Sequence, residues 1–359
     1  MSKFELSLSS DYVPGWTIVD AIRELFQNAV DQEAQCPDNT ASWDYSDDTL
    51  RVSNKKSTLT TTSLLLGSTS KAGDTGTIGQ FGEGYKVATL VLLREGKTVT
   101  FYNYGAREVW RPRFVKSRRF NADILTFFID KEFPWTNVPS DDLVVEIQGI
   151  TDDEWLESIV PSNLRLRDDF DVVETTDYGD IISLPGQVFV NGLFVCNYKP
   201  YKYGYNFKPG QLKLDRDRKL ASDFDLKWLA SKMWSQTAYD SKVLDLLSQG
   251  APDVQFVADI GYRHTLSNRA YEMFSDKYGP NAVPVTYQSD ADNLPKTYKA
   301  IILPETFRRL IVSSSGYIAP VYDEQTIQER LQEWYDIYKY LLTDEAKSNL
   351  EIIIEDSAN

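Results

Sequence analysis

The spacing of apolar and polar residues predicts a long helix near the start of the chain. From Thr17 the segment TIVDAIRELFQNAVDQEA runs without glycine or proline. Its apolar residues form two stripes at helical spacing, so most of its circumference is expected to be buried. The remaining stripe is polar and contains Glu24, Asn28 and Asp31, which the i, i+4, i+7 spacing places on one face.

The pattern then changes to short segments typical of strands. TLRVSN (49–54) is the first, and a Ser/Thr-rich segment and a glycine run lead from it to an apolar helix at 85–93. Further strands are predicted at 98–105, 108–114, 123–130 and 143–150. Helices packed against several antiparallel strands belong to the α+β class.

A second region is predicted to begin near residue 156. It contains QVFVNGLFVCNY (187–198), LKLDRDRKLAS (212–222) and a helix from about residue 223 to 247. The glycine and proline of SQGAPD (248–253) are typical of a linker. We therefore expect three domains, at residues 1–155, 156–250 and 251–359.

The third region alternates short apolar runs with helical patterns, which predicts a small C-terminal α/β-helical region. One face of its last long helix is apolar and is formed by Ile327, Leu331, Trp334, Tyr338 and Leu341. The chain stops in SNLEIIIEDSAN, a helical pattern without a glycine or proline stop signal. Either the helix frays there or more protein follows.

Composition narrows the functional classes. The 359 residues include 38 Lys+Arg and 53 Asp+Glu, a formal net charge of −15, which argues against general adhesion to nucleic acid. Cys36 and Cys196 have no zinc or disulfide spacing, which favours a reducing compartment. No apolar stretch approaches the roughly 20 residues of a membrane helix, and no secretory signal opens the chain. We expect a cytoplasmic protein without a membrane span.

One local cluster is basic despite the acidic total. In RPRFVKSRRF the cations Arg111, Arg113, Lys116, Arg118 and Arg119 alternate with apolar residues. On a strand, part of this charge lies on one face. The cluster is therefore either a solvated strand face or a docking patch.

The glycine run has the composition of a phosphate-binding loop. Gly79-x-x-Gly82-x-Gly84 directly precedes a helix, where free backbone N–H groups and the helix N-terminus can cradle phosphate. The G-x-x-x-x-G-K-[ST] motif is absent, and Val87 occupies the place of the third glycine of G-x-G-x-x-G. A P-loop and a dinucleotide fingerprint are therefore excluded.

Together the two motifs resemble the GHKL superfamily of ATPases, the Bergerat-fold group that includes gyrase B, MutL and histidine kinases. ELFQNAVDQ (24–32) matches the polar positions of its E-L-x-x-N-A-x-D box, and IGQFGEGYKVATLV (78–91) is similar to its second glycine box. The resemblance implies a sandwich of helices on a mixed, mostly antiparallel sheet. It also implies ATP and Mg²⁺ as ligands.

The same resemblance implies roles for individual residues. Asn28 would coordinate Mg²⁺, Glu24 would be the general base for the attacking water, and Asp31 would support the adenine side of the pocket. Further nucleotide-binding residues are Lys71 as a lid lysine, Lys86, and the loop residues Gly79, Phe81, Gly82 and Gly84. For Lys71 a solvated loop lysine is an equal alternative.

The chain departs from the family where adenine is recognised. The first glycine box, usually D-x-G-x-G, is occupied by residues 53–57 from Ser53 onward, without its Asp or glycines, and a family Thr falls on Asp142. One interpretation is a relocated carboxylate, Asp142 or the pair Asp47 and Asp48, that accepts from the adenine amino group. The other is altered base specificity or weakened nucleotide binding.

The second region is similar in layout to the transducer domain of this superfamily. In that domain a basic residue on a loop reaches the γ-phosphate, and Arg216 and Arg218 are the preferred candidates here, ahead of Lys219. A surface ladder of Asp and Arg is the alternative. The order of parts is also loosely similar to phage rIIA-type proteins.

The expected function is a slow Mg²⁺-dependent ATPase that uses nucleotide state as a conformational switch. Nucleotide-dependent homodimerisation and an unidentified protein partner follow from the same resemblance. The alternative is a nucleotide-binding interaction protein that does not hydrolyse ATP, which the lost first glycine box favours and Glu24 opposes. An acidic decoy ranks last. His264, the single histidine, lies in no recognisable phospho-acceptor helix, which disfavours a histidine kinase.

Overall fold

The computed structural model describes the chain except residues 66–83, 119–120, 132–140, 213–221, 239, 261–263, 323–326 and 358–359. Contacts divide it into two units, residues 1–238 with 251–257, and residues 239–250 with 258–359. Each unit is described by itself. No helix among the described residues has the length and apolar character needed to cross a membrane.

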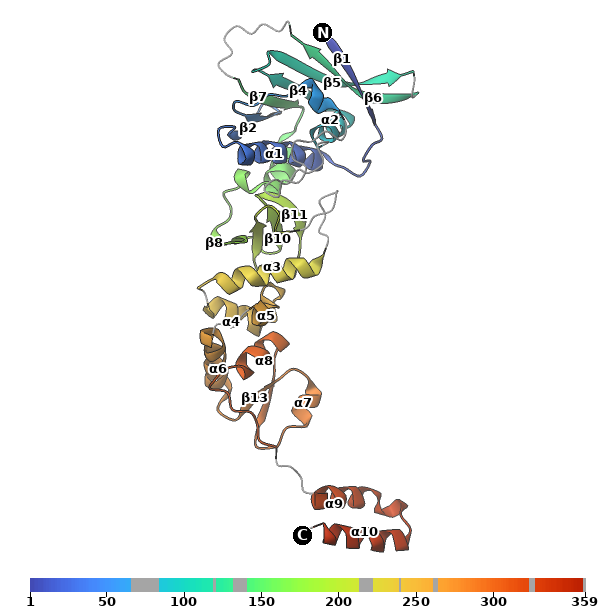
Figure 1. The fold of residues 1–359 in the computed structure, drawn as a ribbon, viewed down its shortest axis with the longest axis vertical. Coiled ribbons are helices and arrows are strands. Elements are labelled where there is room, and N and C mark those ends of the chain that lie inside the picture. The colour runs from blue at the N-terminus through green and yellow to red at the C-terminus, as the bar shows by residue number, and fades with distance from the viewer. Residues whose placement is uncertain are drawn as a thin grey trace. The chain divides into compact units, whose positions relative to one another are not determined.

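A large sheet forms the first layer of the first unit (Figure 1). Its strands are β1 (Ser2–Ser9), β2 (Ala41–Ser46), β3 (Thr49–Asn54), β4 (Thr98–Asn103), β5 (Glu108–Ser117), β6 (Ala122–Asp130) and β7 (Leu143–Gln148). Their order is β1-β6-β5-β4-β7-β3-β2, and every neighbouring pair is antiparallel. The predicted α+β class is confirmed. The N-terminal strand β1 and the strand β2 are additions to the predicted set.

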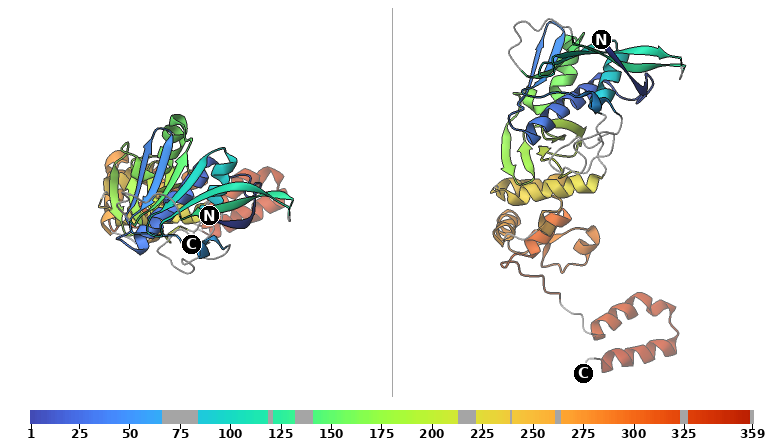
Figure 2. Two further views of the ribbon diagram at one scale, coloured as in Figure 1. Left: turned by 90° about the horizontal axis from the view of Figure 1, so that it is seen from above. Right: turned by 45° about the horizontal axis from the view of Figure 1, so that its top comes forward.

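Two helices, α1 (Ile18–Gln35) and α2 (Gly84–Arg94), pack side by side against this sheet (Figure 1; Figure 2). Thr17 begins α1 with a capping box, in which its hydroxyl accepts from the Asp20 amide and the Asp20 carboxylate accepts from the Thr17 amide. The apolar stripes of α1, including fully buried Ile22 and Phe26, fill the core against the sheet. This packing sets the rotation of α1 about its axis.

The opposite face of the sheet is polar. A ladder of ion pairs crosses three strands, with Arg51 placed 3.4 Å from Asp44 and 2.9 Å from Glu146. In the basic cluster, Arg111 lies 3.7 Å from Asp130, and the Arg113 guanidinium stacks 3.9 Å from the centre of the Phe128 ring. Both arginines are exposed on β5, as the alternation predicts.

A smaller sheet follows in the same unit. Its strands are β8 (Val172–Thr176), β9 (Gly179–Ile182), β10 (Gln187–Val190), β11 (Leu193–Asn197) and β12 (Gly204–Phe207), in the order β11-β10-β12-β9-β8. Strands β10 and β12 are parallel, and the other neighbours are antiparallel. Asn191 and Gly192 make the β10–β11 turn at φ of 49° and 83°, which suits these two residue types. Short helical segments η2 (Glu154–Ile159), η3 (Val160–Ser162) and η4 (Leu164–Leu166) lead into this sheet.

The single helix predicted at 223–247 is two helices, α3 (Asp223–Gln236) and α4 (Asp240–Ser248). The prediction was wrong because Thr237 ends α3. Its backbone is extended, at φ −75° and ψ 155°, and both its N–H and its hydroxyl donate to the Trp234 carbonyl. Hydrophobic periodicity continues through such a break, so it does not reveal the stop.

A buried polar network fastens α3 and the segment η5 (Pro252–Val254) to β12. The Asp253 carboxylate is fully buried and accepts from the Tyr205 hydroxyl at 2.7 Å and from the Lys202 and Tyr203 amides. The Trp234 indole N–H donates to the same Tyr205 hydroxyl at 2.8 Å. Burial raises the pKa of Asp253, and these hydrogen bonds oppose that shift.

Tyr201 beside this network allows a stability prediction. Its hydroxyl is buried and has no hydrogen-bond partner in the part of the chain that the structure describes, and burial raises its pKa far above the usual range. We expect Tyr201→Phe to stabilise the protein by about 1 kcal/mol, since an unsatisfied buried hydroxyl carries a desolvation penalty. Urea unfolding measures this, with Tyr205→Phe as the matched variant that loses two hydrogen bonds and destabilises. Equal effects of the two variants would contradict the prediction.

The second unit is built from α4 and from the elements at and after residue 258, with the first residue of α5 assigned to the first unit. These are α5 (Val257–Ile260), α6 (His264–Tyr278), β13 (Ala282–Val285), α7 (Gln288–Asp292), β14 (Lys299–Ile302), α8 (Glu305–Val312), α9 (Ile327–Tyr338), η6 (Lys339–Leu341) and α10 (Asp344–Asp356). Strands β13 and β14 form a parallel pair. Phe274, Phe307 and Leu310 are buried where α6 meets α8, and they form the core of this unit.

Candidate functional site

The polar stripe of α1 is buried. Glu24 is 2% exposed, Asp31 is 0% exposed and Gln27, which lies between them, is 1% exposed, while Asn28 is half-buried. Burying carboxylates is costly unless they are held by partners or serve a ligand. A merely solvated stripe, the simpler interpretation of this pattern, is therefore excluded at Glu24 and Asp31.

The glycine box begins α2 directly against this stripe. A Cβ built on Gly84 would lie 2.4 Å from Glu24 Oε2 and 3.4 Å from Asn28 Nδ2. Real Cβ atoms do not approach other atoms to 2.4 Å, so a side chain at residue 84 would displace the Glu24 carboxylate. The two motifs are about 60 residues apart in the sequence, and they meet at van der Waals distance in the structure.

The groups at this meeting point suit a phosphate. Gly84 is the first residue of α2, whose leading N–H groups have no intrahelical acceptor. Asn28 Nδ2 is buried and has no hydrogen-bond partner among the described residues. An anionic oxygen at the start of α2 would satisfy these donors, and the amide oxygen of Asn28 is a ligand type that Mg²⁺ accepts. The chain therefore fits a nucleotide phosphate with Mg²⁺ here.

The described residues on either side of the glycine-rich segment are tied together. The Tyr85 hydroxyl lies 2.9 Å from the Ser63 hydroxyl, in the short helix η1 (Thr61–Leu64), and burial raises the pKa of Tyr85 to about 12. Lys86 is fully buried, and its Nζ donates to the Leu65 carbonyl at 2.5 Å. Lys86 was predicted to contact phosphate, and in the structure its ammonium group bonds the backbone just before residue 66. Four others, Lys71, Gly79, Phe81 and Gly82, lie outside the described residues.

The end of β3 lies against α1, where the family resemblance places the adenine. Asn54 is buried, and its Nδ2 donates to the Ala29 carbonyl at 2.9 Å and the Asn39 carbonyl at 3.0 Å. Ser53 precedes it, half-buried and paired with Val144. Asn54 thus joins the strand to the helix, a role that the sequence does not reveal because both acceptors are backbone carbonyls distant in the chain.

The structure separates the two candidate relocated carboxylates. Asp142 Oδ1 accepts from the Lys56 amide at 3.2 Å, which places it beside the segment that replaces the first glycine box. Asp47 and Asp48 form the β2–β3 turn, at the opposite end of β3. Only Asp142 lies at the end of β3 that faces the carboxyl-terminal half of α1.

Asp31 belongs to the same end of α1. Its Oδ2 lies 3.5 Å from Gln27 Nε2, a long hydrogen bond inside the core. The Gln27 Oε1 is buried without a hydrogen-bond partner among the described residues. Gln27 is thus a second polar residue that sequence reasoning missed, because it occupies an unspecified position of the matched box.

The segment η4, which leads into the smaller sheet, contacts α1 through an ion pair. Arg165 in η4 places its Nη1 2.8 Å from Glu33 Oε2, and Glu33 Oε1 accepts from the Ala41 amide at 3.2 Å. Arg165 is a cation that sequence reasoning did not select. The selected ones, Arg216, Arg218 and Lys219, lie outside the described residues.

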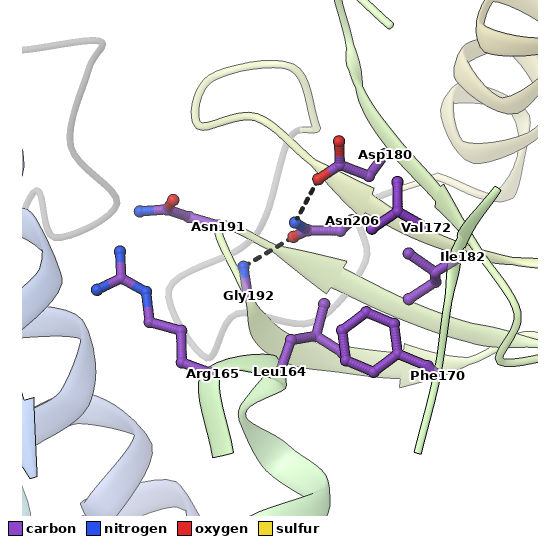
Figure 3. A pocket seen from close by; sticks show the side chains of 9 residues that line it. All are labelled: Leu164, Arg165, Phe170, Val172, Asp180, Ile182, Asn191, Gly192 and Asn206. Atoms are coloured by element: carbon purple, nitrogen blue, oxygen red, sulfur yellow. Dashed lines mark hydrogen bonds between the residues drawn. The ribbon is translucent and has the colours of Figure 1, made fainter. Parts of the chain in front are cut away.

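A shallow pocket of about 250 Å³ lies on the smaller sheet next to this ion pair (Figure 3). Its lining residues are Leu164, Arg165, Phe170, Val172, Asp180, Ile182, Asn191, Gly192 and Asn206. Figure 3 shows Arg165 and Asn191 at one end and the apolar side chains at the other. The amide of Asn206 bridges the Gly192 N–H at 2.7 Å and Asp180 Oδ2 at 3.2 Å. Its polar groups therefore largely satisfy one another.

No group of three or more His, Cys, Asp or Glu side chains suited to a metal ion occurs in the described part of the chain. A metal at the α1–α2 junction would therefore depend on Asn28, nucleotide phosphates and water. Such a ligand set is ordinary for Mg²⁺, which retains several waters and binds phosphate oxygens.

Comparison with known proteins identifies no family for the chain. No protein-family model matches it, and no curated protein matches it in sequence. Among solved structures it is similar to the B subunit of DNA gyrase from Myxococcus xanthus, with a TM-score of 0.29 and 10% identity over 66% of this chain and 91% of that one. At this TM-score the similarity carries no functional argument. The functional argument rests on the geometry of α1 and α2.

Proposed function

We propose that this protein binds ATP in the manner of GHKL ATPases and hydrolyses it slowly with Mg²⁺. The observation that carries the proposal is the contact of Gly84 with Glu24 and Asn28, because it joins the two sequence motifs at one place. Buried acids on α1 and the N-terminus of α2 are what a triphosphate with an attacking water requires. The carboxyl-terminal half of α1, with Asp31, and the end of β3, with Asp142, would hold the adenine base.

Each group at the junction of α1 and α2 has its own role in this proposal. The α2 N-terminus and the amide of Asn28 bind phosphate oxygens and orient them. Glu24 accepts the proton of the attacking water, and its burial beside the phosphate site keeps it close to that water. The amide oxygen of Asn28 would help to hold Mg²⁺, which when bound would neutralise phosphate charge. We further propose that Arg216 or Arg218 senses the γ-phosphate and that nucleotide state switches the conformation.

Calorimetry with ATP and a non-hydrolysable analogue, followed by Mg²⁺-dependent phosphate release, tests this function. Binding together with slow, Mg²⁺-dependent phosphate release is the expected result. Absence of binding to either nucleotide would overturn the proposal.

A second candidate function is nucleotide binding without hydrolysis. It is favoured by residues 53–57, which lack the Asp and the glycines of the first glycine box in the resembled family. Binding without phosphate release in the experiment above would select it. Comparison of ATP with GTP in the same titration tests base specificity, and we expect ATP to bind more tightly.

Gly84→Ala tests the junction of the two motifs. The new methyl group must move the Glu24 carboxylate, which lies 2.4 Å from its ideal position, and a displacement of about 1 Å at a catalytic group can lower a rate about 10²-fold. We expect that loss in phosphate release. Gly15→Ala is the matched control, because a Cβ at Gly15 meets nothing within 4 Å. Equal rates in the two variants would remove Gly84 from the site.

A further inference from the structure

The smaller sheet ends at β8, whose outer side has no neighbouring strand. In the order β11-β10-β12-β9-β8 this strand is the last, and β9 is its one partner among the described strands. An edge strand offers backbone N–H and C=O groups to a further extended segment. Val172, the first residue of β8, is 55% exposed, so this edge also presents apolar surface.

The pocket of about 250 Å³ on this sheet reaches the edge at Val172. Figure 3 shows Val172, Ile182 and Phe170 at the end of the pocket away from Arg165. Ile182 belongs to the core of the smaller sheet, and Phe170 packs against that core. The polar groups of the lining bond one another, and the Arg165 guanidinium is paired with Glu33. The part of the pocket without a partner is therefore apolar, and its volume suits one aliphatic or aromatic side chain.

The chain around this edge is acidic. Residues 168–180 contain no Lys or Arg, and their acids are Asp168, Asp169, Asp171, Glu174, Asp177 and Asp180. Asp169 is paired with Arg167 at 2.7 Å. Asp171 and Glu174, which lie on either side of Val172 in the sequence, have no cation at ion-pair distance in the part of the chain that the structure describes. Their negative charge beside the pocket is thus not neutralised.

The nearest lysines lie beyond the strand and leave this charge in place. Lys208 Nζ donates to the Thr176 carbonyl at 3.2 Å, and Lys232 Nζ lies 5.1 Å from the centre of the Tyr178 ring. Both contacts belong to the turn after β8. Nucleic acid and anionic membranes would be repelled at this edge, and a second copy would bring the same acids together. A segment with Lys or Arg beside an apolar residue is complementary to it.

We propose that the β8 edge binds an extended, basic segment of a partner protein, with one apolar side chain of that segment in the pocket beside Val172. Backbone hydrogen bonds to an edge strand supply affinity that is independent of sequence. The pocket and the carboxylates of Asp171 and Glu174 select the segment, because they require an apolar residue next to cations. The site differs from the α1–α2 junction and needs no nucleotide.

Fluorescence anisotropy with labelled seven-residue peptides tests this site on the full chain without nucleotide. The central residue of the peptides is Leu, Val, Phe or Ser, and the three residues on each side are Lys-Thr-Lys or Glu-Thr-Glu. We expect Lys-flanked peptides with an apolar centre to bind, and to bind roughly tenfold more tightly than the peptide with a central Ser. The Glu-flanked peptides are expected not to bind.

A pair of variants tests the acids. Asp171→Asn/Glu174→Gln removes two charges beside Val172 and is expected to weaken binding of the Lys-flanked Leu peptide by roughly three- to tenfold. Asp153→Asn/Glu157→Gln is the matched control, because it removes two exposed acids at η2 in the same unit. We expect the control to bind like the wild type. Circular dichroism of both variants verifies their folding.

Each contrary outcome overturns the proposal. Equal binding of the Leu and Ser peptides would exclude the pocket, and equal binding by the two variants would exclude the acids. If no peptide binds, the acids serve only to protect the edge from strand pairing. If the Lys-flanked peptide dissociates a wild-type dimer in sedimentation velocity, the edge belongs to a second copy of the chain. Nucleotide is absent throughout, so failure of this site and failure of the proposed ATPase function are distinguishable.

Discussion

Glu24→Gln will lower Mg²⁺-dependent phosphate release by about 10²–10⁴-fold while the affinity for ATP stays unchanged. Glutamine keeps the shape of the side chain, which lies buried between α1 and the first residue of α2, but it cannot accept a proton from water. Loss of turnover with retained binding is therefore the signature of a general base. Single-turnover phosphate release and calorimetry on the same preparations measure both quantities.

The matched control for this prediction is Glu95→Gln. Glu95 lies just beyond the other end of α2, on the surface, where it pairs with Arg94 at 3.4 Å. The same change from Glu to Gln is made there, away from the proposed site. We expect its turnover to equal that of the wild type. If Glu24→Gln turned over ATP as fast as the control, Glu24 would hold no catalytic role.

Asp253→Ala will destabilise the first unit by about 3–5 kcal/mol. The change removes the acceptor of the Tyr205 hydroxyl and of the Lys202 and Tyr203 amides, and each buried donor left without a partner costs about 1–3 kcal/mol. Urea unfolding followed by tryptophan fluorescence reports the loss, since Trp234 belongs to the same network. A cost below about 1 kcal/mol would show that the network does not hold η5 and α3 to the sheet.

The pH dependence of this effect has a definite sign. Burial raises the pKa of Asp253 in the folded protein, so its contribution to stability is fully present below the unfolded pKa and is lost as pH rises through the folded one. The difference between the wild type and Asp253→Ala should therefore narrow as pH rises through that window. Asp253→Asn, which keeps one acceptor oxygen and cannot ionise, should cost less than Asp253→Ala at neutral pH.

The local elements could be predicted from the sequence because their signals are local. The capped start of α1 at Thr17, its two apolar stripes and the period-two strands appear in the structure close to the expected residues. The break between α3 and α4 could not be predicted, since it depends on the bonds of Thr237 to the Trp234 carbonyl. Strand β1 was also missed, although Phe4, Leu6 and Leu8 alternate with polar residues, which is a local strand signal.

The candidate site also has one part that the sequence predicts and another that it does not. The box that contains Glu24, Asn28 and Asp31 is continuous on one helix, so its common face follows from helical spacing alone. That this face is buried, that Gly84 lies against it, and that Asp142 rather than Asp47 lies at the relevant end of β3 depend on how the strands are ordered. Strand order comes from contacts between residues far apart in the chain, and neither periodicity nor composition encodes those contacts. Helical spacing therefore fixes which residues share a face of α1, while contacts between distant parts of the chain fix what that face meets.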